Sequence, residues 1–535
     1  MLIQSRIPAV NREKLTQEDT EMSSQNSQFH PLHEYIANNY LEDENSVVKN
    51  LLAHARASKA HSIKIQNTAA NLIKTIRNEQ QQASGLQAFL NHYDLSSQEG
   101  VILMCIAEAL LRIPDNETMD ALISDKLSSA SWDKHLGESH SLFVNASTWA
   151  LMLTGQTLKP QKAAIKNPKQ YISKLFARME EPVVRAAMKS AMRIMAWQFV
   201  MGRSISEALK RSRSTENRHY RYSFDMLGEA AITTGDAEAY QQAYAIAIEK
   251  IGASVDTELP EVSRPGISIK LSALCPRYEY TQKERAISEL SQRLLELARL
   301  AQNQGIGLTV DAEEADRLEM SLIIFEKVFL SADMENWNGF GLVVQAYQKR
   351  ALPIIKWLNQ LAQRNNRIIP LRLVKGAYWD TEIKHAQEQG LSGYPVFTRK
   401  CNTDVSYQAC ARYLLEECHS IYPQFATHNA QTLAYVYHHA GTREYEFQRL
   451  HGMGEELYEE VTDKDKLNIP CRVYAPVGKH EDLLPYLVRR LLENGANTSF
   501  VNQMAHEESM NDEINIDPVL IVESLGNEIK HPRIP

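Results

Sequence analysis

The sequence predicts an α/β protein in which a (β/α)8 barrel of the TIM type follows an all-α region and an arm. Two observations lead to this prediction. From about residue 33 to residue 215, apolar residues recur every three or four positions, as they do in packed helices. After about residue 218, short β-type runs alternate with helical stretches. Eight such strand-helix units are typical of a (β/α)8 barrel.

The N-terminal part is predicted to be a disordered lead followed by helices. Residues 1–30 are polar and include SSQNSQ at 23–28, a composition that favours disorder. We expect a helical arm over residues 31–89 and an all-α domain over residues 90–215. Helical periodicity is clear in three runs: VVKNLLAHARA (47–57), EGVILMCIAEALLRI (99–113) and VVRAAMKSAMRIMAWQFVMG (183–202).

The barrel is predicted over residues 216–505. Its eight β-type runs are HYRYSFDMLGE (219–229), ISIKLSAL (267–274), GLTVDAEEAD (307–316), GLVVQAYQ (341–348), LRLVKGAYWD (371–380), FATHNA (425–430), YEFQRLHGMGE (445–455) and CRVYAPVG (471–478). Helical stretches such as KERAISELSQRLLELARLAQN (283–303) and VSYQACARYLLEEC (405–418) lie between several of them.

Composition narrows the class of protein. The 535 residues are 44% hydrophobic and 23% charged, which is ordinary for a soluble protein. No apolar run approaches the ~20 residues of a membrane span, and the N-terminus lacks a secretory signal, so the sequence predicts a cytoplasmic protein. The net charge of -8 argues against a protein whose main task is to hold nucleic acid.

The cysteines give no sign of a metal site. They form no CxxC pair and no zinc-like cluster, which fits reduced thiols and predicts that no metal is bound. The six are Cys105, Cys275, Cys401, Cys410, Cys418 and Cys471.

Polar residues gather where the β-type runs end. In a (β/α)8 barrel the active site forms at the C-terminal ends of the strands. Burying so many polar groups costs free energy unless they pair or bind something. Taken singly, each has a simpler explanation, such as an ion pair between Lys270 and Asp311 or a loop capped by His428. The set comprises Asp225, Glu229, Lys270, Asp311, Glu313, Gln345, Arg372, Lys375, Tyr378, Trp379, Thr427, His428, Asn429, His451 and Tyr474.

An amphipathic helix with two adjacent arginines, YLVRRLLENG (486–495), follows the eighth run. Its leucines share one half of the helix, whereas Tyr486, Arg489, Arg490 and Glu493 share the other. An exposed face with Arg489 paired to Glu493 is one interpretation, and an anion clamp is the other. Because this helix directly follows the last strand, its polar stripe is well placed to face the barrel mouth.

Several motifs, in sequence order from about residue 90 to residue 502, carry a resemblance to a known family. They are IKLSAL, DAEEADRLE, QAYQKR, RLVKGAYWD, TRKCNTDVSYQACA, FATHNA, YEFQRLHGMGE, RVYAPVG and YLVRRLLENGANTSF. Together they resemble the proline dehydrogenase module of proline utilization A, a bacterial bifunctional flavoenzyme. SSQEGVILMCIAEALLRIPD and SLFVNASTWALMLTG are similar to the helical domain that precedes that barrel.

The resemblance implies FAD-dependent oxidation of L-proline to Δ1-pyrroline-5-carboxylate, the first step of proline catabolism to glutamate. Hydride would pass from proline C5 to flavin N5, and the electrons would go on to a membrane quinone. Peripheral contact with the inner membrane is an option that the resemblance leaves open. The chain contains no GxGxxG fingerprint, so FAD is implied by the resemblance alone.

The resemblance also implies a set of flavin contacts. Arg399 and Lys400 suit a pyrophosphate, Gly376 allows close backbone approach, and Arg372 suits the electron-rich ring. The implied contacts are Asp311, Ala312, Gln345, Arg372, Val374, Gly376, Ala377, Trp379, Thr398, Arg399, Lys400, Thr427, His428, Asn429 and Leu450.

Proline would lie against the flavin. The resemblance implies that Lys270, Arg489 and Arg490 hold its carboxylate, which makes the arginine pair an anion clamp. The implied catalytic set is Lys270, Arg372, Tyr474, Arg489 and Arg490. Asp311, Tyr378, Leu450, Tyr474 and Tyr486 complete the substrate pocket, and Glu493, Glu229 and Asp225 form a gate.

Two departures from the family give further expectations. Residues 1–30 are too short for the ribbon-helix-helix domain with which many members bind DNA, so we expect no nucleic-acid partner. Residues 506–535 resemble the linker to an aldehyde dehydrogenase domain, so we expect an excised or truncated form of a longer protein. Without the resemblance, a Schiff-base aldolase that uses Lys270 in the same barrel is the alternative.

Overall fold

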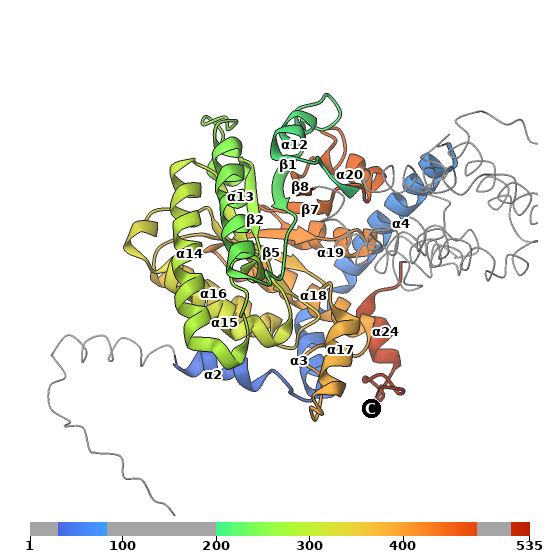
Figure 1. Cartoon of the computed structure of the whole chain (residues 1–535). Helices are drawn as coiled ribbons and strands as arrows, with labels where there is room; N and C mark the ends of the chain where they lie inside the picture. Colours follow the sequence, from blue (N-terminus) through green and yellow to red (C-terminus); the bar gives the residue numbers. More distant parts are fainter. Residues whose placement is uncertain (1–29, 83–198, 479–514, 535) are drawn as a thin grey trace, which may run out of the picture.

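Eight parallel strands close into a barrel in sequence order, β1 to β8 (Figure 1). The computed structural model describes residues 30–82, 199–478 and 515–534. This arrangement confirms the predicted (β/α)8 barrel. The expected disordered lead and most of the expected all-α domain lie outside the described residues. The strands are β1 (Arg221–Met226), β2 (Gly266–Ile269), β3 (Gly307–Val310), β4 (Phe340–Gln345), β5 (Ile369–Val374), β6 (Ile421–Ala426), β7 (Glu446–Leu450) and β8 (Cys471–Val477).

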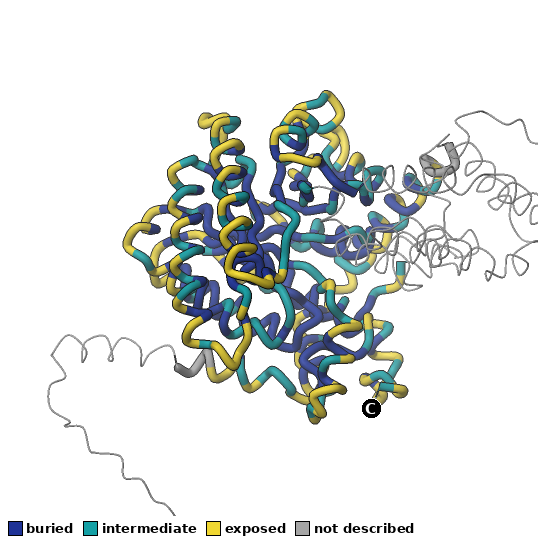
Figure 2. Tube along the Cα trace, in the orientation of Figure 1, coloured by how far each residue is buried: buried dark blue, intermediate teal, exposed yellow. Residues whose placement is uncertain are grey.

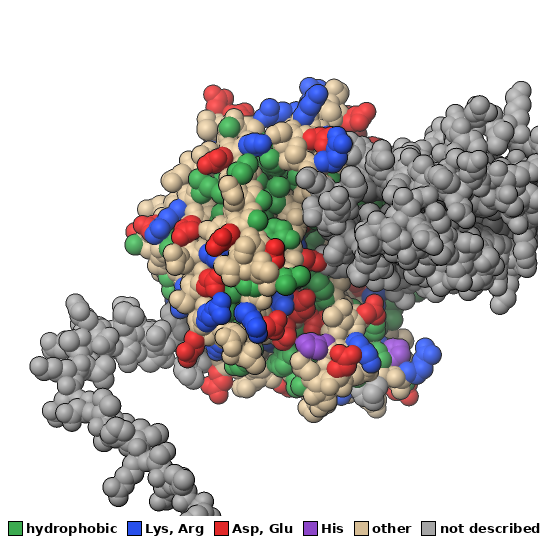
Figure 3. Space-filling view, in the orientation of Figure 1, with side chains coloured by type: hydrophobic (Ala, Val, Ile, Leu, Met, Phe, Trp, Pro, Cys, Tyr) green, Lys and Arg blue, Asp and Glu red, His purple; other side chains and the backbone are tan. Residues whose placement is uncertain are grey.

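Helices connect the strands and cover the outside of the barrel (Figure 1). The helix predicted over 283–303 coincides with α14, and the one predicted over 405–418 lies largely within α18. Charged side chains of both signs are intermingled on the molecular face in Figure 3. The helices are α12 (Ile205–Ser212), α13 (Thr234–Gly252), α14 (Lys283–Asn303), α15 (Leu318–Phe329), α16 (Ala351–Arg364), α17 (Trp379–Glu388), α18 (Lys400–Glu416), α19 (Ala430–Ala440) and α20 (Glu455–Thr462), with short 3-10 turns η1 (Glu261–Ser263), η2 (Leu271–Ala273), η3 (Tyr280–Gln282), η4 (Ala315–Arg317) and η5 (Ala332–Met334).

The sixth strand begins earlier than its β-type run. The run was predicted at 425–430, whereas β6 spans Ile421–Ala426 and contains Pro423. Proline normally argues against an interior strand because it has no N–H to donate to the sheet. Here Pro423 is accommodated opposite Leu371 of β5. The polar residues that end the run, Thr427 to Asn429, therefore form the loop after the strand.

The main hydrophobic core lies between the barrel and its helices. Outward-facing strand residues such as Ile267, Leu308 and Phe447 are fully buried there. Phe325 of α15 stacks on Phe340 of β4 with their ring centroids 4.6 Å apart. Figure 2 shows this buried layer running through the centre of the molecule. Burial of that surface is the main favourable term in holding helices to strands.

The barrel interior is polar, which is unusual because most barrels of this type are filled with branched apolar side chains. Toward the N-terminal strand ends, the fully buried Glu446 of β7 binds Arg472 of β8 at 2.5 Å and Arg221 of β1 at 3.0 Å. Gln424 and Gln448 also donate to this carboxylate, at 2.8 Å and 3.1 Å. Each charge inside the barrel thus has a partner from another strand.

An arm and a C-terminal segment brace one side of the barrel. The arm consists of α2 (His30–Asn38), α3 (Glu44–Ala55) and α4 (Lys59–Gln82), and the C-terminal segment contains α24 (Pro518–Ser524). Helix α3 and helix α24 both pack against α18, while α4 packs against α19 (Figure 1). The two ends of the described chain therefore meet on the same barrel helices.

Replacing Glu446 by alanine should destabilise the fold strongly, because it leaves the guanidinium groups of Arg221 and Arg472 without their counter-ion. We expect the free energy of unfolding to fall by about 3–5 kcal/mol in urea titrations at pH 7. Glu444→Ala removes an exposed carboxylate two residues away, and should cost no more than about 0.5 kcal/mol.

The same comparison should depend on pH. Burial alone would raise the pKa of Glu446, but Arg472 and Arg221 outweigh burial and lower the pKa. The carboxylate therefore stabilises the fold above its unfolded pKa of about 4.3, and this stability is lost as the pH falls through the folded pKa. The difference in the free energy of unfolding between wild type and Glu446→Ala should therefore become smaller in acid. A difference below about 1 kcal/mol at pH 7 would contradict a paired buried charge.

Candidate active site

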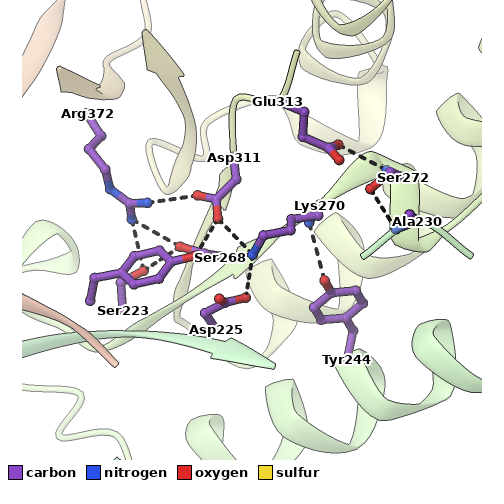
Figure 4. Close-up of polar contacts among 11 residues, drawn as sticks. Ser223, Asp225, Ala230, Tyr244, Ser268, Lys270, Ser272, Asp311, Glu313 and Arg372 are labelled. Atoms are coloured by element: carbon purple, nitrogen blue, oxygen red, sulfur yellow. Dashed lines mark hydrogen bonds and ion pairs between the residues drawn. The ribbon is translucent and has the colours of Figure 1, made fainter. Parts of the chain in front are cut away.

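Oppositely charged side chains from different strands meet near the C-terminal end of the barrel (Figure 4). Lys270 follows β2 directly, and its Nζ lies 2.9 Å from Asp225 Oδ1 and 3.5 Å from Asp311 Oδ2. The same ammonium donates to the Tyr474 hydroxyl at 3.2 Å. Lys270 thus does pair with Asp311, the simpler arrangement that the sequence left open.

Arg372 of β5 closes this ionic cluster on the opposite side. Its Nη1 donates to Asp311 Oδ1 at 2.8 Å, and its Nη2 donates to the hydroxyls of Ser223 and Ser268 at 3.1 Å each. The Tyr474 hydroxyl donates to Asp311 Oδ2 at 2.7 Å. We use the name ionic cluster for Asp225, Lys270, Asp311, Arg372 and Tyr474; its two carboxylates balance its two cations.

Burial and charge fix the protonation of the ionic cluster. Burial alone would lower the pKa of Lys270, but Asp225 and the neighbouring acidic groups raise that pKa well above its usual range. Burial raises the pKa of Tyr474 well above its usual range, and the two carboxylates add to this effect. Near pH 7 the lysine is therefore an ammonium and the tyrosine a neutral phenol. Both can donate hydrogen bonds.

Two polar atoms of the ionic cluster have no hydrogen-bond partner in the part of the chain that the structure describes. They are Asp225 Oδ2 and Arg372 Nε, and both side chains are buried. A buried polar atom left unsatisfied costs about 1–3 kcal/mol. Such atoms are typical of a site that a ligand or an ordered water completes. The cluster is therefore suited to binding a polar ligand.

The three residues expected to form a gate lie in different parts of the chain's fold or outside the described residues. Asp225 is fully buried and binds Lys270, and its part in a gate stays a prediction. Strand alternation turns position 225 to the same interior face as Ser223. Glu229 lies in the half-buried loop after β1. Glu493, the third expected gate residue, lies outside the described residues.

The loop that carries Glu229 is tied to the neighbouring strand ends (Figure 4). The backbone N–H of Ala230 donates to Ser272 Oγ at 3.1 Å, and that of Ala231 donates to the Ser272 carbonyl at 2.9 Å. The Ser272 N–H in turn donates to Glu313 Oε1 at 3.0 Å. Ala230 has a left-handed φ of 52°, which a non-glycine residue adopts only when its surroundings hold it.

The residues after β4 and β5 form a close-packed wall. Gly376 has a φ of 136°, and a Cβ atom there would lie 2.4 Å from Tyr347 Cγ, so a larger residue does not fit. Trp379 begins α17, and its Nε1 donates to the Phe397 carbonyl at 2.8 Å. Among the other residues expected near the flavin, Gln345 is buried and its Oε1 accepts a hydrogen bond from Gln348. Val374 and Ala312 are half-buried, and Ala377 is exposed. Tyr378, expected in the substrate pocket, is half-buried and precedes α17.

Basic groups near the start of α18 are held by other parts of the chain. Arg399, expected to offset pyrophosphate charge, donates to the carbonyls of Lys530 and Glu528 at 3.0 Å and 3.2 Å. Lys400 binds Asp404 at 3.2 Å, and Lys375 binds the same carboxylate at 2.5 Å. Lys375 directly follows β5, but the resemblance did not assign it to the cofactor. Its position beside Lys400 was not visible in the sequence.

The ends of β6 and β7 are joined by hydrogen bonds. The Leu450 N–H donates to His428 Nε2 at 3.2 Å, which is the loop-capping arrangement that the sequence also left open. Asn429 caps α19 by accepting from the Thr432 N–H at 2.8 Å, and Thr427 Oγ1 accepts from the Asn429 N–H at 3.1 Å. The pocket residues Tyr486, Arg489 and Arg490 lie outside the described residues.

Sequence reasoning missed two serines that orient Arg372. Ser223 and Ser268 accept from its guanidinium and bond to each other at 3.0 Å. Neither ends a strand run, so the search at strand ends passed over them. Inward alternation along β1 and β2 would have been the signal, because position 223 precedes 225 by two and position 268 precedes 270 by two.

A closed (β/α)8 barrel with a buried ionic cluster near its C-terminal strand ends defines an enzyme of the barrel class. Residues 208–503, more than half of the chain, match the family model described as Proline dehydrogenase. The chain therefore belongs to the proline dehydrogenase family.

Known relatives are similar over nearly the whole chain. The bifunctional protein PutA of Salmonella typhimurium is 52% identical over 509 residues, which cover 92% of this chain and 38% of that protein. The Escherichia coli protein of the same name is 51% identical over 514 residues, covering 93% of this chain and 38% of that protein. A crystal structure of a Bradyrhizobium japonicum Proline Utilization A mutant has a TM-score of 0.71 and 44% identity, covering 93% of this chain and 49% of that one. The chain thus spans about two fifths of the length of these curated relatives.

Two further family models match the N-terminal part. Residues 31–77 match the Proline utilization A proline dehydrogenase N-terminal domain, and residues 85–199 match the DNA-binding domain of Proline dehydrogenase. The second match counts against our expectation that nucleic acid is not a partner. Nearly all of its residues lie outside the described ranges. Within those ranges, no helix combines the length and apolar character needed to cross a membrane.

Proposed function

We propose that this chain oxidises L-proline to Δ1-pyrroline-5-carboxylate with FAD as its cofactor, the first step of proline catabolism. The observation that carries this proposal is the ionic cluster near the C-terminal end of the barrel, in a chain of the proline dehydrogenase family. Its buried, protonated Lys270 suits a substrate carboxylate. Its Arg372 Nε, which has no hydrogen-bond partner among the described residues, suits an electron-rich ring.

The residues around the ionic cluster fit FAD. Arg399 and Lys400 would supply positive charge for a pyrophosphate, and Lys375, which shares Asp404 with Lys400, would add to it. Arg372, Trp379 and the other residues of the expected contact set would surround the remainder of the cofactor. When bound there, FAD would supply the hydride acceptor for proline oxidation. The same proposal includes a quinone as the final electron acceptor and a peripheral position at the inner membrane.

The chain's own groups would bind and orient proline. Lys270 would contribute its ammonium, which Asp225 and Asp311 hold in place from two sides. Arg489 and Arg490 would complete the grip on the carboxylate, as the resemblance implies. Neutral Tyr474 would form part of the ring pocket together with Leu450, its register partner on β7, which packs against the same buried Phe199 and Met453. A substrate held by several charge-assisted bonds keeps its reacting carbon in one place.

The Schiff-base alternative is disfavoured by the protonation of Lys270. A lysine attacks a carbonyl only as the neutral amine, and enzymes that use this chemistry lower the pKa of the lysine. Here the surrounding acidic groups raise the pKa of Lys270 well above its usual range, although burial opposes them. The amine is therefore a poor nucleophile near pH 7, and the ammonium is a good anion-binding group.

The purified full chain should contain non-covalent FAD and reduce it with L-proline. We expect a yellow protein whose visible flavin bands bleach when L-proline is added without oxygen, with formation of Δ1-pyrroline-5-carboxylate. Acid precipitation should release the pigment into the supernatant. D-proline serves as the matched control and should bleach the bands far more slowly. A chain that binds no flavin when FAD is supplied, or whose flavin proline does not reduce, would show that the proposed function is wrong.

The arginine clamp can be tested by Arg489→Met. Loss of a charge-assisted contact worth roughly 1.5–3 kcal/mol should raise the KM for proline about 10- to 100-fold, with a smaller fall in kcat. The flavin spectrum should hardly change. Arg218→Met, at an exposed arginine ahead of β1, is the control and should leave the KM for proline unaltered. An unchanged KM in Arg489→Met would favour the exposed-face interpretation of that helix instead.

A further inference from the structure

A buried carboxylate of the arm reaches the segment that precedes α18. Glu44, the first residue of α3, is only 1% exposed. Its Oε1 accepts from the Thr398 N–H at 2.9 Å and from Asn402 Nδ2 at 2.6 Å, and its Oε2 accepts from the Thr398 hydroxyl at 2.8 Å. Charge-assisted bonds of this kind are among the strongest in proteins. The carboxylate therefore fixes Thr398 both through its backbone and through its side chain.

The peptide unit that Glu44 holds also holds Trp379. The N–H of Thr398 and the C=O of Phe397 belong to one peptide group, which is planar and rotates as a unit. Its carbonyl accepts from Trp379 Nε1 at 2.8 Å. Glu44 therefore binds the N–H of this peptide, and Trp379 binds its C=O. A rotation that breaks the first bond also moves the acceptor of the second.

From this arrangement we propose that Glu44 is a positioning residue for the cofactor-binding wall. It acts by fixing the Phe397–Thr398 peptide, and through that peptide the indole of Trp379 and the start of α18 at Lys400. This inference rests on the proposed function, because Trp379, Thr398 and Lys400 are expected FAD contacts. It assigns a role in FAD affinity to the arm, which lies more than 300 residues earlier in the chain.

The C-terminal segment also contacts Thr398 and Asn402, but it does not replace the bond from the Thr398 N–H to Glu44. The His531 N–H donates to Thr398 Oγ1 at 2.9 Å, and Asn402 Nδ2 donates to the Ile529 carbonyl at 3.0 Å. These contacts satisfy part of the polar groups near Thr398, but neither accepts from the Thr398 N–H. Removing Glu44 therefore leaves that buried N–H without the acceptor that orients the peptide.

The arm has other anchors, so loss of the Glu44 carboxylate should act locally. Val48 and Leu51 of α3 are buried in the main hydrophobic core. Lys349 Nζ donates to the Glu42 carbonyl at 2.7 Å, and Lys530 binds Asp43 at 2.8 Å. These contacts keep α3 docked on the barrel. The ionic cluster draws on none of them, so binding of proline itself should not depend on Glu44.

The test compares Glu44→Ala and Glu44→Gln with wild type in the full chain. FAD is removed, and the dissociation constant of added FAD is measured from the quenching of its fluorescence. Glu44→Ala should raise this constant about 10-fold or more. Glu44→Gln keeps an oxygen for the Thr398 N–H but loses the charge, so it should raise the constant about 3-fold. Glu42→Gln is the matched control, because that residue is exposed and its hydrogen bond with Lys349 runs through its backbone carbonyl. Its FAD affinity should equal that of wild type.

A second measurement separates positioning of the cofactor from general damage. At saturating FAD, the KM for proline in both Glu44 variants should stay within about 2-fold of wild type, whereas the dissociation constant of FAD should rise. A folded Glu44→Ala protein with wild-type FAD affinity overturns the inference. If Glu44→Ala does not fold, Glu44→Gln decides, and wild-type FAD affinity in that variant overturns it as well. A wild-type chain that binds no FAD overturns the proposed function and this inference together.

Discussion

Every charge buried inside this barrel must be neutralised by a charge on another strand. An isolated ion in such a place costs several kcal/mol, and it is tolerated only when partners of opposite sign and hydrogen bonds surround it. Lys270 with Asp225 and Asp311 meets this requirement near the C-terminal strand ends, and Glu446 with Arg221 and Arg472 meets it toward the other end. These pairs tie β1, β2, β3, β7 and β8 across the interior. We expect the strand register to depend on them.

The same constraint prepares the site for chemistry. Because the charges of the ionic cluster cancel, Lys270 keeps its proton and Arg372 is held by Asp311 and two serines in one orientation. Preorganised groups of this kind bind a developing or fixed charge without reorganising when the ligand arrives. The unsatisfied Asp225 Oδ2 and Arg372 Nε mark where the described network is incomplete. A substrate carboxylate and an electron-rich ring are ligands that such a network accommodates.

The sequence predicts what local patterns encode. Eight alternating units predicted the barrel, and the periodicity of residues 283–303 predicted α14 with the same bounds. Strand ends also pointed to Lys270 and Asp311. Patterns that depend on distant contacts were not predictable. Pro423, for example, lies within β6 because its neighbours tolerate it. Glu44 meets Thr398 across 354 positions, and Arg399 meets carbonyls near the C-terminus. No motif records such pairings.

The proposed function requires that the ammonium of Lys270 form part of the substrate carboxylate site beside a bound flavin. It is tested most directly with tetrahydrofuran-2-carboxylate, which keeps the carboxylate of proline and lacks the oxidisable amine. Its binding to the flavin-loaded protein is followed by the perturbation of the flavin absorbance, in wild type and in Lys270→Met. We expect saturable binding to wild type and a dissociation constant at least about 10-fold higher in Lys270→Met, with FAD content retained. Equal affinity in the two flavin-loaded proteins would contradict it.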